Sequence, residues 1–235
     1  SVIGITSTFS SILMFLGVLS MVIGGVLAIG QWDFKRLLAY SSISQIGYIV
    51  LGIGLGTPLG ILGGLFHLLN HSIFKSLLFL NSGAVEYSTG TRDLKQMGGL
   101  SQKMPTTATT NVIASMSIVG IPPFSGFWSK LIIIIATVQA GHIGYAFWAV
   151  LVSVLTLAMY VKVLKYAFFG SLPEKWNQIK EVPFFMKLSM GVLAFICVVG
   201  GVLGLHSVRE VFLQLATKTI LEGVKYAEIV FQSLQ

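Results

Sequence analysis

Long apolar stretches, each able to cross a membrane, alternate with short polar segments along this chain. A hydrocarbon core about 30 Å thick requires about 20 apolar residues in one helical crossing. The pattern therefore predicts an all-α, polytopic transmembrane helical bundle that forms one unit over residues 1–205. Six stretches meet this length and give the expected spans: 9–30, 37–55, 59–84, 106–140, 145–169 and 184–205.

The segment 206–235 has a different pattern. Apolar residues such as Val211, Leu215 and Val224 alternate there with Arg, Glu and Lys. This spacing predicts an amphipathic helix on the outer surface of the membrane. Contact with a partner subunit is the other interpretation.

The fourth stretch is too long for one crossing and contains helix-breaking residues. Gly120, Pro122, Pro123 and Gly126 lie inside it. Proline lacks an N–H donor and clashes with a preceding carbonyl, so we expect a broken helix with unpaired backbone groups. Broken helices at mid-membrane are typical of ion and substrate sites in transporters, although a packing kink is the commoner role of one membrane proline.

Composition supports a membrane location. Of the 235 residues, 10% are charged and 54% are hydrophobic, and the mean hydropathy is +0.87. In a membrane protein, the distribution of the basic residues between loops indicates orientation. The net charge of +7 therefore gives no reason to expect nucleic acid as a partner. The positive-inside rule predicts a multi-pass protein of the cytoplasmic membrane with both termini outside, because Lys and Arg gather in alternate loops: Lys35, Arg36, Arg92, Lys95, Lys103, Lys175, Lys180 and Lys187.

The predicted spans contain basic residues but no Asp or Glu. His67, His71, Lys75 and Lys130 lie well inside them. A charged side chain at the bilayer centre costs at least about 2.5 kcal/mol, so each of these groups requires an explanation.

His67, His71 and Lys75 recur every fourth residue, which places them in a slightly slanted column on one helix face. Histidine exchanges protons near neutral pH, so the column suits a proton path through side chains and water. A structural hydrogen-bonded set is the alternative. A metal site is disfavoured because a lysine follows and carboxylate or cysteine ligands are lacking nearby.

Two further lysines are candidates for this path. Lys130 follows the helix break at a depth similar to that of Lys75, and we expect the two to form a lateral pair. Lys162 either belongs to the same path or reaches toward the cytoplasm.

Polar residues accompany these groups. Ser41, Gln45 and Tyr48 follow helical spacing, so one face of the second span turns toward protein or water, and Asn70 lies within the column. Before this span, Asp33 is placed to cap the helix, in a cytoplasmic turn that also carries Lys35 and Arg36.

The single cysteine, Cys197, excludes an internal disulfide and any cysteine cluster for a metal or an iron–sulfur centre. We therefore expect no cofactor and no catalytic centre in this chain, only structural waters and lipid. The chain begins at Ser1, so a cleaved, split-gene or partial sequence are equal expectations.

Five stretches resemble the antiporter-like subunits shared by respiratory complex I, Mrp-type Na⁺/H⁺ antiporters and membrane-bound hydrogenases. They cover much of residues 9–170, and residues 226–230 resemble the Mrp and hydrogenase branch. The stretches are Asp33–Ser42, Ser44–Tyr48, His67–Leu80, Met97–Leu100 and Gly120–Lys130.

The resemblance implies that this chain carries the second of two inverted five-helix repeats plus the last helix. The family's lysine on the broken helix falls on Lys130, and its histidine and lysine column falls on His67, His71 and Lys75. The first repeat, with its glutamate and lysine pair, is absent here. A complete pathway would therefore require another polypeptide segment.

The resemblance also implies a function and partners. We expect proton translocation by the C-terminal half of an antiporter-like subunit, in a complex of several membrane subunits whose redox cofactors lie in partners such as an NADH dehydrogenase or a hydrogenase. An Mrp-type antiporter subunit and a non-conducting membrane anchor are the alternatives. A sodium site is disfavoured because sodium prefers carboxylate oxygens.

Overall fold

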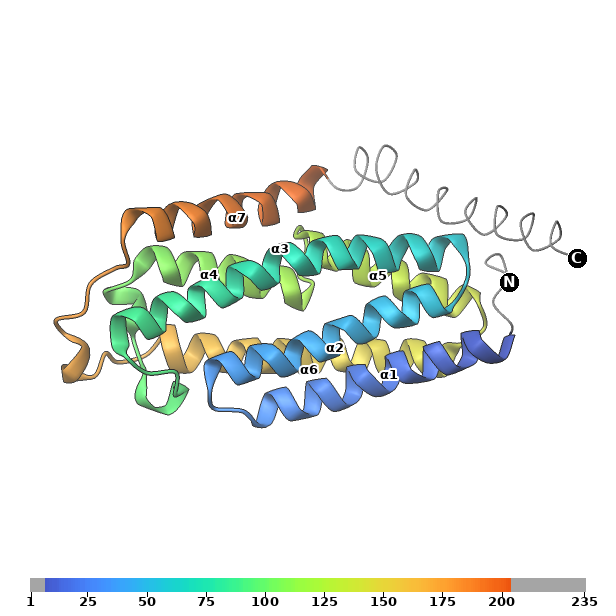
Figure 1. Cartoon of the computed structure of the whole chain (residues 1–235), viewed down its shortest axis with the longest axis horizontal. Helices are drawn as coiled ribbons and strands as arrows, with labels where there is room; N and C mark the ends of the chain where they lie inside the picture. The colour runs from blue at the N-terminus through green and yellow to red at the C-terminus, as the bar shows by residue number, and fades with distance from the viewer. Residues whose placement is uncertain (1–6, 204–235) are drawn as a thin grey trace, which may run out of the picture.

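The computed structural model describes residues 7–203, with side chains described as far as residue 200, and it is a bundle of long α-helices (Figure 1). No β-strand occurs in this part of the chain. The α-helices are α1 (Ser7–Gly30), α2 (Phe34–Gly54), α3 (Pro58–Thr89), α4 (Pro105–Val119), α5 (Ser125–Gln139), α6 (Ile143–Val163) and α7 (Phe184–Leu203).

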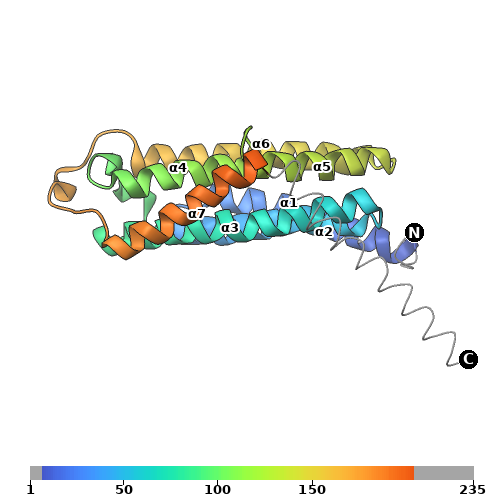
Figure 2. The same ribbon diagram turned by 90° about the horizontal axis from the view of Figure 1, so that it is seen from above.

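The helices form two layers that lie side by side. Figure 2 shows α1, α2 and α3 in one layer and α4, α5 and α6 in the other, with α4 and α5 end to end. Helix α7 crosses obliquely and packs against α3, α4 and α5. A π-helical turn, Leu164–Phe168, extends α6, and short 3₁₀ turns lie at Leu94–Gln96, Leu100–Gln102 and Glu174–Trp176.

The observed helices agree with the sequence pattern and refine its boundaries. The fourth apolar stretch is two helices, as its prolines and glycines predict, and α3 continues to Thr89, five residues past the predicted end. Within residues 7–203, three helical segments are long and apolar enough to cross a membrane by themselves: Ser7–Gly30, Phe34–Gly54 and Ile143–Phe168. The full set of six crossings stays a prediction, and the amphipathic segment 206–235 lies outside the described residues.

Glycines allow α1 and α2 to approach each other closely. A Cβ atom on Gly24 would lie 2.5 Å from the Ser44 amide nitrogen, and one on Gly47 would lie 2.5 Å from the Gly17 carbonyl oxygen. Backbone approaches of this kind are typical of membrane helices that pack through small residues. The face of α2 that is not used by this contact is free to meet α3 and α6.

We expect Gly47→Ala to destabilise the protein by about 1–3 kcal/mol, because the added methyl group meets backbone atoms that cannot move aside. Gly83→Ala is the matched control, since a Cβ atom there meets nothing within 4 Å. Thermal unfolding of the two purified variants in detergent measures the difference. Equal melting temperatures would contradict the close packing of α1 against α2.

Candidate functional site

The break between α4 and α5 is built from glycine and proline. Gly120 ends α4 in the left-handed conformation, with φ 85° and ψ 52°, and its amide donates to the Met116 carbonyl at 3.1 Å. Pro122 and Pro123 follow, and α5 begins at Ser125. A Cβ atom on Gly126 would collide with the Ser117 carbonyl, so only glycine fits where the two helix ends meet.

Lys130 satisfies the carbonyl groups that the break exposes. Its Nζ donates to the carbonyl oxygens of Ile118 (2.8 Å) and Val119 (3.3 Å), and the residue is 3% exposed. The last carbonyls of a helix lack partners and carry partial negative charge, which favours a cation at this end. The ammonium also lies 5.1 Å from the centre of the Tyr48 ring.

His67 joins three helices through its two ring nitrogens. Nδ1 lies 2.9 Å from the Ser129 hydroxyl on α5, and Nε2 lies 3.2 Å from Oε1 of Gln45 on α2. The Gln45 amide donates onward to the Thr156 hydroxyl on α6 at 3.5 Å. One turn along α3, Asn70 donates to the Ser125 carbonyl at 3.1 Å, at the start of α5.

Lys75 lies farther along α3 among hydroxyl groups. It is 5% exposed, and its Nζ donates to the Ser41 hydroxyl and to the Tyr160 hydroxyl, the second at 3.4 Å. Ser41 and Tyr160 are themselves 3.1 Å apart. Both partners of the Lys75 ammonium therefore supply a hydroxyl group and not a carboxylate.

The two lysines contact α2 at different levels, and their lateral pairing stays a prediction. Lys75 meets α2 at Ser41, whereas Lys130 meets it at Tyr48. Seven residues of helix separate these contacts by about 10 Å along the axis. The face of α2 that carries Ser41, Gln45 and Tyr48 therefore connects the two lysines, with His67 between them.

His71 differs from its two neighbours in the column. It is half-buried, and the edge of its ring packs against Phe74 with centroids 5.7 Å apart. Its Nε2 is buried without a hydrogen-bond partner among the described residues. Because buried polar atoms are almost always paired, this nitrogen is suited to bind a water molecule.

Lys162 lies away from the column. Its Nζ donates to the carbonyls of Ile29 (2.9 Å) and Gln31 (2.6 Å) where α1 ends, and lies 4.0 Å from the centre of the Trp32 ring. These contacts explain why a lysine is present here, because the C-terminal end of a helix favours a nearby cation. They correspond to the alternative in which Lys162 reaches toward the loop.

The residues predicted for the nearby turn hold two loops together. Asp33 caps α2 by accepting the Arg36 amide at 2.9 Å, and Lys35 forms an ion pair with Glu86 at 2.5 Å. Arg92 lies 3.4 Å from the Asp33 carboxylate. Asp33 therefore has both the capping role that the sequence predicts and a role in joining the loop after α3.

Sequence reasoning missed several polar partners. Three further polar residues contact the predicted site residues: Ser129 contacts His67, Thr156 contacts Gln45, and Tyr160 contacts Lys75. Thr156 and Tyr160 lie four residues apart in an otherwise apolar span, and this spacing was the signal in the sequence that could have identified them. A second polar cluster lies between α3 and α4. Its members are Asn81, Thr110, Asn111 and Ser115, with Thr110 donating to Asn81 at 2.8 Å and Ser115 lying 3.3 Å from Asn111.

In the part of the chain that the structure describes, no three His, Cys, Asp or Glu residues gather in one place. The side chains gathered at the site carry amines, imidazoles, hydroxyls and amides. Such groups can pass protons through hydrogen bonds when water joins them.

Comparison with known proteins identifies the class. The family described as NADH:quinone oxidoreductase/Mrp antiporter, TM, matches residues 2–171, and this chain belongs to it. A Na⁺/H⁺ antiporter component from Alkalihalophilus pseudofirmus is 42% identical over 160 residues, a match that covers 68% of this chain and 32% of that relative.

Two solved structures share the fold. The membrane-bound sulfane sulfur reductase, an archaeal respiratory membrane complex, contains a chain that matches with a TM-score of 0.80 and 39% identity, covering 83% of this chain and 32% of the other. Respiratory complex I from Thermus thermophilus matches with a TM-score of 0.82 and 26% identity, covering 92% and 45%.

The protein is thus a member of the transmembrane family that is shared by NADH:quinone oxidoreductases and Mrp antiporters. It spans well under half the length of the curated relatives that it matches, 40% and 32% for two of them.

Proposed function

We propose that this chain is the proton-conducting C-terminal half of an antiporter-like subunit in a redox-linked membrane complex. The observation that carries the proposal is the run of protonatable and hydroxyl groups from Lys130 to Lys75, which is buried and has no ion-paired carboxylate among the described residues. Such groups are expensive in a membrane and are retained where they serve transport.

The proposed path begins at Lys130 beside the helix break. Ser129 and His67 come next, joined by the 2.9 Å contact between the hydroxyl and Nδ1. A water molecule on the unpaired Nε2 of His71 would bridge toward Lys75, whose hydroxyl partners Ser41 and Tyr160 end this section. Imidazole and amine groups can hold the proton at each stage, while Gln45 orients His67.

A branch toward the loop between α3 and α4 extends this path. Asn81 and Asn111 are fully buried, and the amide nitrogen of each has no protein partner among the described residues. Buried amide donors of this kind call for ordered water. We infer that water between these asparagines links Lys75 to the loop side, which the distribution of Lys and Arg assigns to the cytoplasm; both chain termini then lie outside.

The rest of the machinery would lie in partner subunits, including whatever supplies the first repeat and the redox cofactors. The 39% identity to a chain of an archaeal respiratory complex supports this assignment. The antiporter relative supports the second candidate, a subunit of an Mrp-type antiporter. A non-conducting membrane anchor is the third, and it would need no protonatable column.

His67→Gln tests the proposed function. Glutamine can still bond Ser129 and Gln45 but cannot carry a proton, so we expect proton translocation by the purified complex in vesicles to fall at least about tenfold, which corresponds to about 1.4 kcal/mol of added barrier. The matched control is His142→Gln in the loop before α6, which should pump normally.

Unchanged pumping by His67→Gln, with normal assembly of the complex, would support the anchor and overturn the proposal. Replacing sodium in the vesicles separates the two conducting candidates. Translocation that persists without sodium favours a redox-linked proton pump, whereas strict dependence on sodium favours the antiporter.

A further inference from the structure

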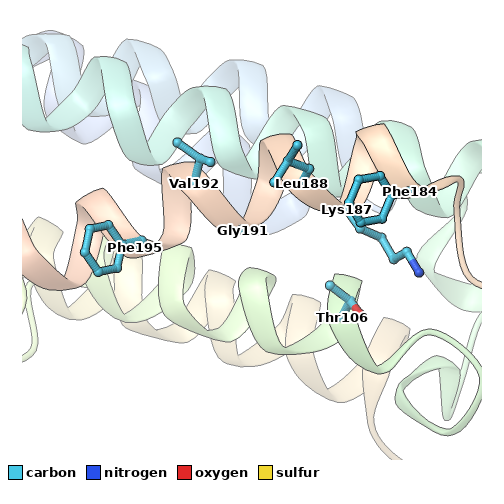
Figure 3. A pocket seen from close by; sticks show the side chains of 7 residues that line it. All are labelled: Thr106, Phe184, Lys187, Leu188, Gly191, Val192 and Phe195. Carbon is cyan, nitrogen blue, oxygen red and sulfur yellow. The ribbon is translucent and has the colours of Figure 1, made fainter.

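An apolar groove of about 440 Å³ lies along one side of α7, next to the start of α4 (Figure 3). Its walls include Phe184, Leu188, Val192 and Phe195, and the two phenylalanines are each 66% exposed. Their spacing places them along one side of α7. Helices α3, α4 and α5 pack elsewhere on this helix and leave these side chains uncovered.

The length of the groove matches one leaflet of a membrane. From Phe184 to Phe195 the helix rises about 16 Å, close to half of a hydrocarbon core about 30 Å thick. The space beside Gly191, in the middle of the groove, is open, since a Cβ atom there would meet nothing within 4 Å. An extended acyl chain fits this length and this apolar surface.

One end of the groove carries a positive charge. Figure 3 shows the Lys187 ammonium at the same end as Thr106. The ion pairs of the described residues join Lys35 and Arg92 to Asp33 and Glu86, and none includes Lys187.

The neighbouring carboxylate is already engaged. Glu181 accepts the backbone amides of Thr106 (2.8 Å) and Thr107 (3.3 Å) and the Thr107 hydroxyl (2.6 Å). It thereby caps the start of α4, and none of the ion pairs of the described residues joins it to Lys187. Exposed Lys180 adds a second cation nearby in sequence.

A second groove of the chain provides a contrast. It has about 340 Å³ between α1 and α6, is lined by apolar residues including Phe15 and Trp148, and has no charged residue. It could contact any acyl chain but has no means of distinguishing one headgroup from another. The charge at Lys187 is therefore what distinguishes the α7 groove from the groove between α1 and α6.

We propose that the α7 groove binds one anionic phospholipid, with an acyl chain along Leu188, Val192 and Phe195 and the phosphate at Lys187. A lysine near a helix end places its charge at the headgroup level while its stem lies on apolar surface, as this geometry requires. The site is independent of the proton path and would fix α7 against α4 at the edge of the bundle.

The test uses the intact complex in phosphatidylcholine vesicles that contain a photoactivatable lipid with either a phosphatidylglycerol or a phosphatidylcholine headgroup. Mass spectrometry then maps labelling on α7. We expect the anionic probe to label α7 about fivefold more than the zwitterionic one, the preference that a single lysine supplies. This comparison uses the unaltered protein and so does not depend on any variant folding.

Two variants distinguish recognition of the lipid headgroup from contact with its acyl chain. Lys187→Gln should remove the preference between the probes, and Gly191→Leu should reduce labelling by both because it fills the groove. Lys175→Gln, an exposed lysine of the preceding loop, and Gly144→Leu, in the uncharged groove, are the matched controls and should change neither value on α7.

Equal labelling of α7 by both probes in the unaltered complex would overturn the proposal and leave an unselective lipid contact. Cross-linking of α7 to a partner subunit, without lipid labelling, would also overturn it, because a protein would then occupy the groove. A preference that persists in Lys187→Gln would show that another group binds the headgroup and contradict the assignment to Lys187.

Discussion

Lys75→Met is expected to lower proton translocation about a hundredfold while leaving the complex assembled. The side chain is buried, and among the described residues its ammonium donates hydrogen bonds only to the Ser41 and Tyr160 hydroxyls, while the Phe79 ring centre lies 5.9 Å away. A methionine of similar length fills the space but cannot hold a proton. A proton that passes the position of Lys75 would then be an unstabilised charge at the membrane centre, which costs about 3 kcal/mol. A barrier raised by this amount lowers the rate about a hundredfold.

The measurement is acidification of vesicles that contain the purified complex, with subunit content determined on the same sample. Lys103→Met, in the loop before α4, removes a lysine that lies outside the proposed path and should pump at the normal rate. Normal pumping by Lys75→Met would mean that protons pass α3 by another route.

Two substitutions of Lys130 are expected to distinguish the role of its positive charge from its ability to exchange a proton. Lys130→Arg keeps a cation able to donate to the Ile118 and Val119 carbonyls, so the helix break should persist. Arginine does not release its proton in proteins. We therefore expect assembly close to normal together with a loss of translocation as large as that of Lys75→Met.

Lys130→Met is the companion variant. It removes the donors as well as the proton carrier, and the end of α4 loses a favourable charge worth about 0.3–1 kcal/mol, or up to about 2 kcal/mol in a buried setting. Translocation should fall in both variants, but only the methionine variant should show a lower melting temperature. Pumping by Lys130→Arg at the normal rate would show that Lys130 acts as a fixed charge.

The sequence was most informative where a residue conflicted with its surroundings. Pro122 and Pro123 in an apolar stretch predicted the broken helix, and the spacing of Ser41, Gln45 and Tyr48 predicted the polar face of α2. The structure brings that face to Lys75, His67 and Lys130. Periodicity succeeds here because it depends only on the geometry of one helix.

Relations between helices were harder to predict. The levels at which the two lysines meet α2 could not be predicted, because periodicity fixes direction around a helix but not the axial offset between α3 and α5. Tyr160 and Thr156 were missed for a related reason, since the sequence alone does not say whether either faces lipid or another helix. Their roles follow from how α6 packs beside α2.

The glycine contacts between α1 and α2 have a mechanical consequence. Two helices whose backbones touch at Gly24 and Gly47 cannot slide without a steric collision, so they behave as a rigid wall. The α2 hydroxyls and amides that face the lysines would then keep fixed positions during the proposed proton transfer. We expect any motion that accompanies it to involve side chains, water, or the break between α4 and α5.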